Sequence, residues 1–230
     1  MAQEIEIKLR IRDKEALRKS LKKLRARPVH GARTRMWQHN VLFDTPQRGL
    51  AKQGQLLRIR RERPVGTVPN GKGAPERVLL TMKMPVQQSG KPEGKPRPRH
   101  RIREEMEVRV ADALSLTKIL EGLGLAGWFQ YERYRTTFRL PFAKKWAKGL
   151  LIELDETPIG TFVELEGPSE AIDRAARELG FSRQAYVLKN YLVLYVEHCR
   201  KRGVEPKHML FDDGSCVQCR TETATKRFPG

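Results

Sequence analysis

Like charges recur two residues apart in several short stretches of this sequence. The acidic pairs are Glu4/Glu6, Glu105/Glu107, Glu153/Asp155 and Glu164/Glu166, and the basic pairs are Arg58/Arg60 and Arg133/Arg135. Side chains two apart on a β-strand point to the same face, so each pair would share one face of a strand. Carboxylates bind hard cations such as Mg²⁺ through oxygen, whereas Arg and Lys hold phosphate oxygens. The pattern indicates a surface that collects metal ions and phosphates.

The opposite faces of these stretches are largely apolar, as in Ile5, Ile7 and Leu9. One interpretation is an ordinary sheet with its apolar face on a core and its charged face in water. A solvated face would more often mix signs or use Thr and Ser. Because some stretches carry only acids and others mainly bases, a metal- and phosphate-binding surface is the alternative that we favour.

Eight stretches have the alternation or composition of strands. They are residues 4–12, 36–44, 55–63, 77–84, 100–110, 131–140, 150–156 and 161–167, and residues 157–160 form a turn between the last two. Helices are expected after Asp13 up to Pro28, over 112–123, over 169–180, and as one long helix from 182 to 203. Polar loops rich in Pro and Gly cover 64–76 and 85–99.

Eight antiparallel strands can close into a barrel. With the charged faces inward, the interior would be a polar tunnel, and the amphipathic helices would cover the apolar outer faces. Buried charges cost several kcal/mol each unless acids, bases and a bound polyphosphate offset one another. We therefore expect an α+β fold, an eight-stranded antiparallel β-barrel with helices packed outside.

The order of these segments resembles a known family. Glu4-Ile5-Glu6-Ile7-Lys8 resembles the ExExK signature that opens the CYTH proteins, the triphosphate tunnel metalloenzymes. The later segments that match in order are Phe43-Asp44-Thr45, Leu57-Arg58-Ile59-Arg60, Leu80-Thr81-Met82-Lys83, Arg103-Glu104-Glu105-Met106-Glu107, Tyr131-Glu132-Arg133-Tyr134-Arg135, Glu153-Leu154-Asp155 and Phe162-Val163-Glu164-Leu165-Glu166. The resemblance covers about residues 3–200.

The resemblance implies roles for residues at the matching positions, with Mg²⁺ or Mn²⁺ as the cofactor. The implied metal ligands are Glu4, Glu6, Glu164 and Glu166, and Glu105, Glu107 and Asp155 would support a second metal or its water shell. The implied phosphate ligands are Lys8, Arg58, Arg60, Lys83, Arg133 and Arg135, with Lys189 on the last helix as a contact at the tunnel mouth. Glu4, Glu6, Lys8 and Lys83 would be the catalytic centre.

Three functions remain open at this point. The first is a metal-dependent hydrolase of inorganic triphosphate, thiamine triphosphate or a nucleoside triphosphate. The second is a class IV adenylate cyclase, which makes cyclic AMP and diphosphate from ATP. The third is a polyphosphate- or RNA-binding module without turnover, which the acidic pairs disfavour. Phosphoryl transfer needs positioning and charge neutralisation more than a protein nucleophile, so the absence of a Ser-His-Asp arrangement is no obstacle.

Composition limits the cellular setting and the partners. The 230 residues hold 46 Lys or Arg against 27 Asp or Glu, a net charge of +19. The sequence has no apolar run of about 18 residues and no signal-peptide core, so no membrane partner and a cytoplasmic location are expected. A triphosphate-containing small molecule is the expected partner, with non-specific polyanion binding as a further possibility. The oligomeric state is not predicted.

The chain is expected to hold one domain over 1–203 and a polar tail over 204–230. Cys216 and Cys219 in the tail form a lone CxxC, which Cys199 and His208 could complete as four zinc ligands. One such pair in a polar segment is a weak signal, so zinc is not predicted.

Overall fold

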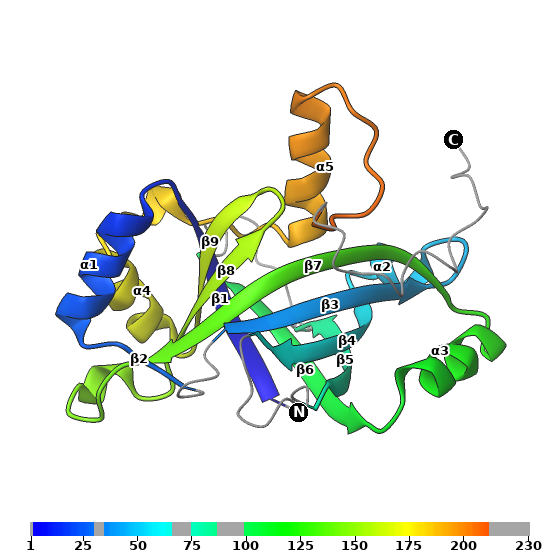
Figure 1. Ribbon diagram of the computed structural model, residues 1–230, viewed down its shortest axis with the longest axis horizontal. Helices are drawn as coiled ribbons and strands as arrows, with labels where there is room; N and C mark the ends of the chain where they lie inside the picture. Colours follow the sequence, from blue (N-terminus) through cyan, green and yellow to red (C-terminus); the bar gives the residue numbers. More distant parts are fainter. Residues whose placement is uncertain (1, 30–34, 66–74, 87–98, 212–230) are drawn as a thin grey trace, which may run out of the picture.

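The computed structural model describes residues 2–29, 35–65, 75–86 and 99–211 (Figure 1). Its strands are β1 (Ala2–Ile11), β2 (Arg27–Pro28), β3 (Arg35–Asp44), β4 (Leu56–Pro64), β5 (Arg77–Pro85), β6 (Arg101–Val110), β7 (Ala126–Arg139), β8 (Leu151–Thr157) and β9 (Gly160–Glu166). All pairings between them are antiparallel, in the order β2-β7-β3-β4-β5-β6-β1-β9-β8. Because β8 also pairs with β7, eight strands close on themselves and β2 is added outside the ring.

The eight predicted strands are therefore confirmed as one closed barrel. The expected hairpin joins β8 to β9, with Thr157 opposite Gly160. Gly160 takes φ 121°, a backbone conformation that suits glycine at such a tight turn. The strand β7 begins at Ala126, five residues before the predicted start, because its first residues pair with the end of β3 beyond an irregularity at Leu42 and Phe43.

The apolar faces of β1, β8 and β9 point outward, under the helices. Ile7 and Leu9 of β1 are 1% and 0% exposed and belong to one core cluster with α1 (Lys14–Leu24) and α4 (Ser169–Glu178). The helix α1 contributes Leu17 and Leu21, and α4 contributes Ile172. Alternation along the strands then turns the charged side chains into the barrel. The remaining helices are α2 (Gly49–Lys52), α3 (Ala113–Gly122) and α5 (Tyr191–Lys201).

The long helix expected over 182–203 was wrong. A short 3₁₀ turn, η2 (Arg183–Ala185), comes first, an extended segment follows, and α5 begins only at Tyr191. Val187 interrupts the helix because its N–H and C=O bond the backbone of Lys8 on β1, at 2.9 and 3.0 Å. The side chain of Asn190 then caps α5 by accepting a hydrogen bond from the Val193 N–H at 2.9 Å.

The end of the domain also lies later than predicted. Met209 is 1% exposed, and it exchanges backbone hydrogen bonds with β7, where the Glu132 N–H donates to its carbonyl at 2.9 Å. The packed chain thus continues to residue 211 and does not end at 203. Cys216 and Cys219 lie outside the described residues, while Cys199 is buried in α5. Among the described residues, no helix is both long enough and apolar enough to cross a bilayer.

Candidate active site in the barrel interior

The inner faces of the barrel strands surround a narrow cavity of about 60 Å³. Eight Lys or Arg side chains line it but only three Glu: Lys8, Arg58, Arg60, Lys83, Arg101, Arg103, Arg133 and Arg135 against Glu4, Glu6 and Glu164. Each comes from the inward-facing side of a barrel strand. A cavity with this surplus of cations favours an anionic ligand of high charge.

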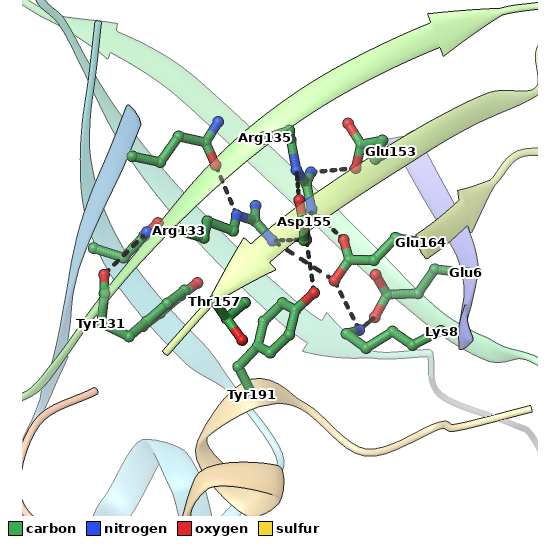
Figure 2. A network of polar contacts seen from close by, with 12 residues as sticks. Glu6, Lys8, Tyr131, Arg133, Arg135, Glu153, Asp155, Thr157, Glu164 and Tyr191 are labelled. Carbon is green, nitrogen blue, oxygen red and sulfur yellow. Dashed lines mark hydrogen bonds and ion pairs between the residues drawn. The ribbon is translucent and has the colours of Figure 1, made fainter. Parts of the chain in front are cut away.

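A buried network of acids and bases fills one wall of the cavity (Figure 2). The Asp155 carboxylate is fully buried and accepts from Arg133 Nη1 at 2.8 Å, from Arg135 Nε at 2.7 Å and from the Tyr191 hydroxyl at 2.7 Å. Arg135 also contacts Glu153 and Glu164. Because three carboxylates share one guanidinium, Arg135 is the electrostatic centre of this wall, and its pKa is raised even though burial alone would lower it.

The two buried lysines are each shared between carboxylates. Lys8 Nζ lies 3.2 Å from Glu6 and 3.1 Å from Glu164, and Lys83 Nζ lies 2.5 Å from Glu4 and 3.2 Å from Glu105. Burial opposes charge on both members of such pairs. For Glu164, however, Lys8 and the two arginines outweigh burial and hold its pKa well below 4.5.

Two arginines of β4 are not neutralised in this way. Arg60 is buried, has no carboxylate within ion-pair distance among the described residues, and donates only to Asn40 Oδ1 at 3.1 Å. Burial, together with Arg58 and Arg133, lowers its pKa to about 10. Arg58 lies no closer than 3.9 Å to Glu107. These two cations are therefore the ones best placed to receive an external anion.

The cavity adjoins a wider recess whose lining is acidic. Five Glu and four Lys or Arg line the recess, the Glu being Glu4, Glu105, Glu107, Glu153 and Glu166. Burial, with the nearby carboxylates of Glu153 and Glu4, raises the pKa of Glu166 to about 8. The interior thus changes from a strongly basic cavity to a recess with one more Glu than cations. Five residues line both spaces: Glu4, Arg58, Arg60, Lys83 and Arg135.

The CYTH domain model matches residues 2–191, which include every barrel strand. The chain belongs to the CYTH family. Members of this family are enzymes that act on triphosphates and generally depend on divalent metals. No curated protein sequence matches the chain.

Solved structures share the CYTH barrel at low sequence identity. The PH1819 protein of Pyrococcus horikoshii is 22% identical with a TM-score of 0.60, and the match covers 86% of this chain and 98% of that one. A candidate adenylate cyclase of Vibrio parahaemolyticus is 19% identical with a TM-score of 0.59, over 82% of this chain and 94% of that one. At these identities the likeness supports the fold alone.

A divalent metal would suit the acidic recess of this CYTH barrel. Among the described residues, no three His, Cys, Asp or Glu side chains already converge as a cation site, and Lys83 lies between Glu4 and Glu105. Yet Glu4 Oε2 is buried and accepts no hydrogen bond, and the pKa of Glu166 is raised by burial and by repulsion from Glu153 and Glu4. A cation with oxygen ligands would relieve both conditions, so the donor set fits Mg²⁺ or Mn²⁺.

Most of the predicted site residues meet in this interior. The cavity and its recess bring together every one of them except Asp155, which lies behind Arg133 and Arg135, and Lys189. Lys189 was predicted on the last helix at the tunnel mouth, but it lies neither on α5 nor among the residues that line the cavity. It lies in the extended segment before α5, about half exposed, and pairs with Glu197 on the outside at 2.5 Å. The hydrogen bonds of Val187 to β1 fix the direction of this segment.

Several lining residues were missed in the sequence. Arg101 and Arg103 are in phase with Glu105 and Glu107 on β6, and Tyr131 is in phase with Arg133 on β7, so extending the two-residue period backward would have found them. Tyr191 could not be found in this way. Its hydroxyl reaches Asp155 from a helix distant in sequence, and its ring lies 5.4 Å from Lys8 Nζ.

Tyr131 should titrate two pH units below an ordinary tyrosine. Burial alone would raise its pKa, but Arg58, Arg133 and Arg60 outweigh burial and lower it to about 8. Phenolate absorbance of the whole protein should show one step near pH 8, which Tyr131→Phe removes. Because the folded pKa lies below the ordinary 10.0, this group adds stability as pH rises from about 8 to 10, and the variant lacks that gain.

Tyr191→Phe is the matched control for this titration. Burial, Asp155 and Glu164 raise the pKa of Tyr191 well above 10.0, so its removal should leave the step near pH 8 intact. A step that survives Tyr131→Phe would contradict the cationic environment assigned to Tyr131.

Proposed function

We propose that this protein is a divalent-metal-dependent hydrolase of a triphosphate. The observation that carries the proposal is the polarity of the barrel interior, where a cavity lined by eight cations and three Glu adjoins a recess lined by five Glu and four cations. The basic part suits a chain of phosphates, and the acidic part suits the metal that accompanies it. A pure binding module would have no use for the acidic recess.

The side chains have distinct parts in the proposed reaction. Arg58 and Arg60, which lack close carboxylates, would take phosphate oxygens first. Lys8 and Lys83 would move from their carboxylate partners to the phosphates and stabilise the charge that develops on the leaving diphosphate. Glu4, Glu6, Glu164 and Glu166 would hold the metal, with Glu105, Glu107 and Asp155 as support. When bound, the metal would neutralise phosphate charge and supply an acidified water.

One observation favours cyclisation as the second candidate. A recess of about 180 Å³ adjoins the basic cavity and shares Arg101 and Arg103 with it, and Trp128, Leu42 and Leu56 form an apolar part of its wall. Such a surface could hold a nucleoside beside the phosphates. Cyclisation also requires that a ribose oxygen be aimed at the α-phosphorus, and no described residue has been assigned that task. Hydrolysis of the terminal phosphate needs less, so it remains the first proposal.

A product assay separates these functions. The full chain is incubated with Mg²⁺ or Mn²⁺ and, separately, with inorganic triphosphate, thiamine triphosphate and ATP. Release of orthophosphate supports hydrolysis, whereas diphosphate together with cyclic AMP supports the cyclase. If no substrate yields a product with either metal, the enzymatic proposal is wrong and a binding module takes its place.

Arg60→Ala and Lys83→Ala should each lower kcat/KM for the triphosphate by about 100-fold. Both changes remove a cation from the proposed phosphate site. They should differ in stability, because Lys83 is paired with Glu4 and Glu105 whereas Arg60 has no carboxylate partner among the described residues. Arg60→Ala should therefore leave the melting temperature unchanged or raise it, and Lys83→Ala should lower it.

Lys118→Ala provides the control, since it removes an exposed lysine of α3 on the outside of the barrel. Its kcat/KM should equal that of the wild type. Wild-type kinetics in both Arg60→Ala and Lys83→Ala would remove these residues from the proposed site.

A further inference from the structure

Two long stretches of the sequence contain no acidic residue. Residues 16–43 and 133–152 have neither Asp nor Glu, although both are rich in Lys and Arg. Some of these cations, such as Arg133 and Arg135, point into the tunnel and are neutralised there. The others are not part of the proposed active site, and they need a separate explanation.

The fold brings the two acid-free stretches together on one side of the barrel. Arg27 of β2 lies directly opposite Arg139 of β7, so the two stretches pair as strands. The helix α1 precedes β2, and η1 (Lys145–Ala147) follows β7. Trp146 of η1 packs in the same core cluster as α1 and α4, with the Arg174 guanidinium 4.5 Å from its ring centre. In Figure 1, α1, α4, β2 and the β7–β8 connection all lie on the left.

Six exposed cations of this side define what we term the basic face: Lys22, Lys23, Arg27, Arg139, Lys145 and Lys148. None of the six has a carboxylate within ion-pair distance in the described parts of the chain. Arg27 and Arg139 form a directly opposed pair of like charges, which destabilises a sheet unless an anion lies between them. The six cations of the basic face therefore lack a close carboxylate partner, and the exposed acids of the neighbouring α4, Glu170 and Glu178, are matched there by the exposed Arg174 and Arg177.

The tunnel does not account for the charge of the protein. The cavity and the acidic recess together are lined by eight Lys or Arg and seven Glu, and the buried Asp155 brings the number of acids to eight. The net charge of +19 therefore belongs to the rest of the chain. Surface charge of this size attracts polyanions and speeds their association.

An exposed aromatic residue lies next to the basic face. Phe142, in the β7–β8 connection, is 97% exposed, a value unusual for so large an apolar side chain. Leu140, Pro141 and Ala147 line a recess beside it, together with Lys145 and Lys148 at its rim. An exposed aromatic ring beside several cations matches the way proteins hold single-stranded nucleic acid, with cations along the backbone and a ring stacked on a base.

We propose that the basic face binds single-stranded nucleic acid, with Phe142 stacking on a base. An anionic membrane is the main competing partner, since it also attracts cations and takes up an exposed phenylalanine. Nucleic acid is favoured because the cations come from several connected elements, the last turn of α1, the β2–β7 pair and the segment around η1, and so suit an extended phosphate backbone. A membrane would require several apolar side chains around Phe142, and Val29, at 36%, is the only other exposed large apolar residue in these two stretches within the described residues.

The test measures binding of a fluorescent oligouridylate of about 12 nucleotides to the full chain. Its 5′ end carries a hydroxyl, so no triphosphate is present to enter the tunnel. At about 0.1 M salt, Lys22→Glu with Lys23→Glu should weaken binding by about tenfold or more and reduce the salt slope. Phe142→Ala should weaken binding by about tenfold and leave binding of an RNA duplex unchanged, because paired bases cannot stack on the ring.

The control variant Lys118→Glu with Lys201→Glu makes the same charge change on α3 and α5, outside the basic face, and should bind like the wild type. Triphosphate turnover of all variants serves as a check that the barrel is folded. Equal weakening in the control would overturn the proposal, because net charge alone would then explain the binding. The proposal is also overturned if Phe142→Ala has no effect on the oligonucleotide but abolishes sedimentation with vesicles that contain phosphatidylserine.

Discussion

Glu166→Gln and Glu4→Gln should each lower the turnover of a triphosphate by at least about 100-fold, while the barrel stays folded. Each change removes one carboxyl group that could ligate the metal from the acidic recess that is proposed to hold it. For Glu166, glutamine resembles the protonated carboxyl that predominates at neutral pH without metal, because its pKa is raised to about 8. The loss of turnover should therefore occur without a loss of stability at pH 7.

The pH dependence of unfolding provides the accompanying measurement for Glu166→Gln. The folded pKa of about 8 exceeds the ordinary 4.5, so the folded state binds more protons than the unfolded state between these values. The stability that this extra proton gives the folded state is therefore lost as pH rises from about 5 to 8, and the variant should not show this loss. Mg²⁺ should raise the melting temperature of the wild type more than that of the variant. Near-normal turnover in both glutamine variants would remove the metal assignment.

Arg135→Met should lower the free energy of unfolding by about 3–5 kcal/mol. The arginine is buried and lies within ion-pair distance of Glu153, Asp155 and Glu164. Its removal leaves one wall of the tunnel with excess buried negative charge. Urea unfolding measures the loss. It should shrink as pH falls, because burial raises the pKa of Glu153 and protonation of this carboxylate removes part of the repulsion that the variant exposes.

Arg139→Met is the matched control on the same strand. Arg139 is exposed, and none of the described carboxylates pairs with it, so the change should alter stability by no more than about 0.5 kcal/mol. Equal effects of the two substitutions would contradict the buried network around Arg135. If Arg135→Met does not accumulate as folded protein, Arg135→Lys, which keeps the charge, should restore part of the stability.

The barrel could be predicted because its strands repeat one simple pattern. Ile7 and Leu9 alternate with Glu6 and Lys8, and this period assigns one face to the helices and the other to the tunnel. The two-residue period also placed the charged pairs of six strands in one interior. Local pattern and tertiary structure agree here, since every barrel strand pairs on both sides and must turn one face inward.

The errors occur where a distant partner decides the local structure. Residues 182–203 have helical composition, yet the backbone of Val187 bonds to Lys8, nearly 180 residues earlier in the chain. This pairing keeps the residues after η2 extended, so α5 begins only at Tyr191. Lys189 therefore lies in the extended segment, on the outside of the barrel. The packing of Met209 against β7 is likewise a contact that no local periodicity could reveal.

The distribution of charge separates the two proposals. Inside the barrel, acids and bases are equal in number in the cavity, the recess and the buried network, and in the proposed reaction they would exchange partners with a metal and a phosphate chain. Outside, the cations of the basic face have no carboxylate within ion-pair distance among the described residues. Failure of nucleic-acid binding would thus leave the enzymatic proposal standing, and the reverse also holds.

Calorimetric titration of the full chain with imidotriphosphate, whose P–N–P bridges resist hydrolysis, tests the central claim most directly. We predict one binding site per chain that is tighter with Mg²⁺ than without it, and at least about tenfold weaker in Arg60→Ala. No binding, or binding that neither Mg²⁺ nor Arg60→Ala alters, would contradict a metal–triphosphate site inside the barrel.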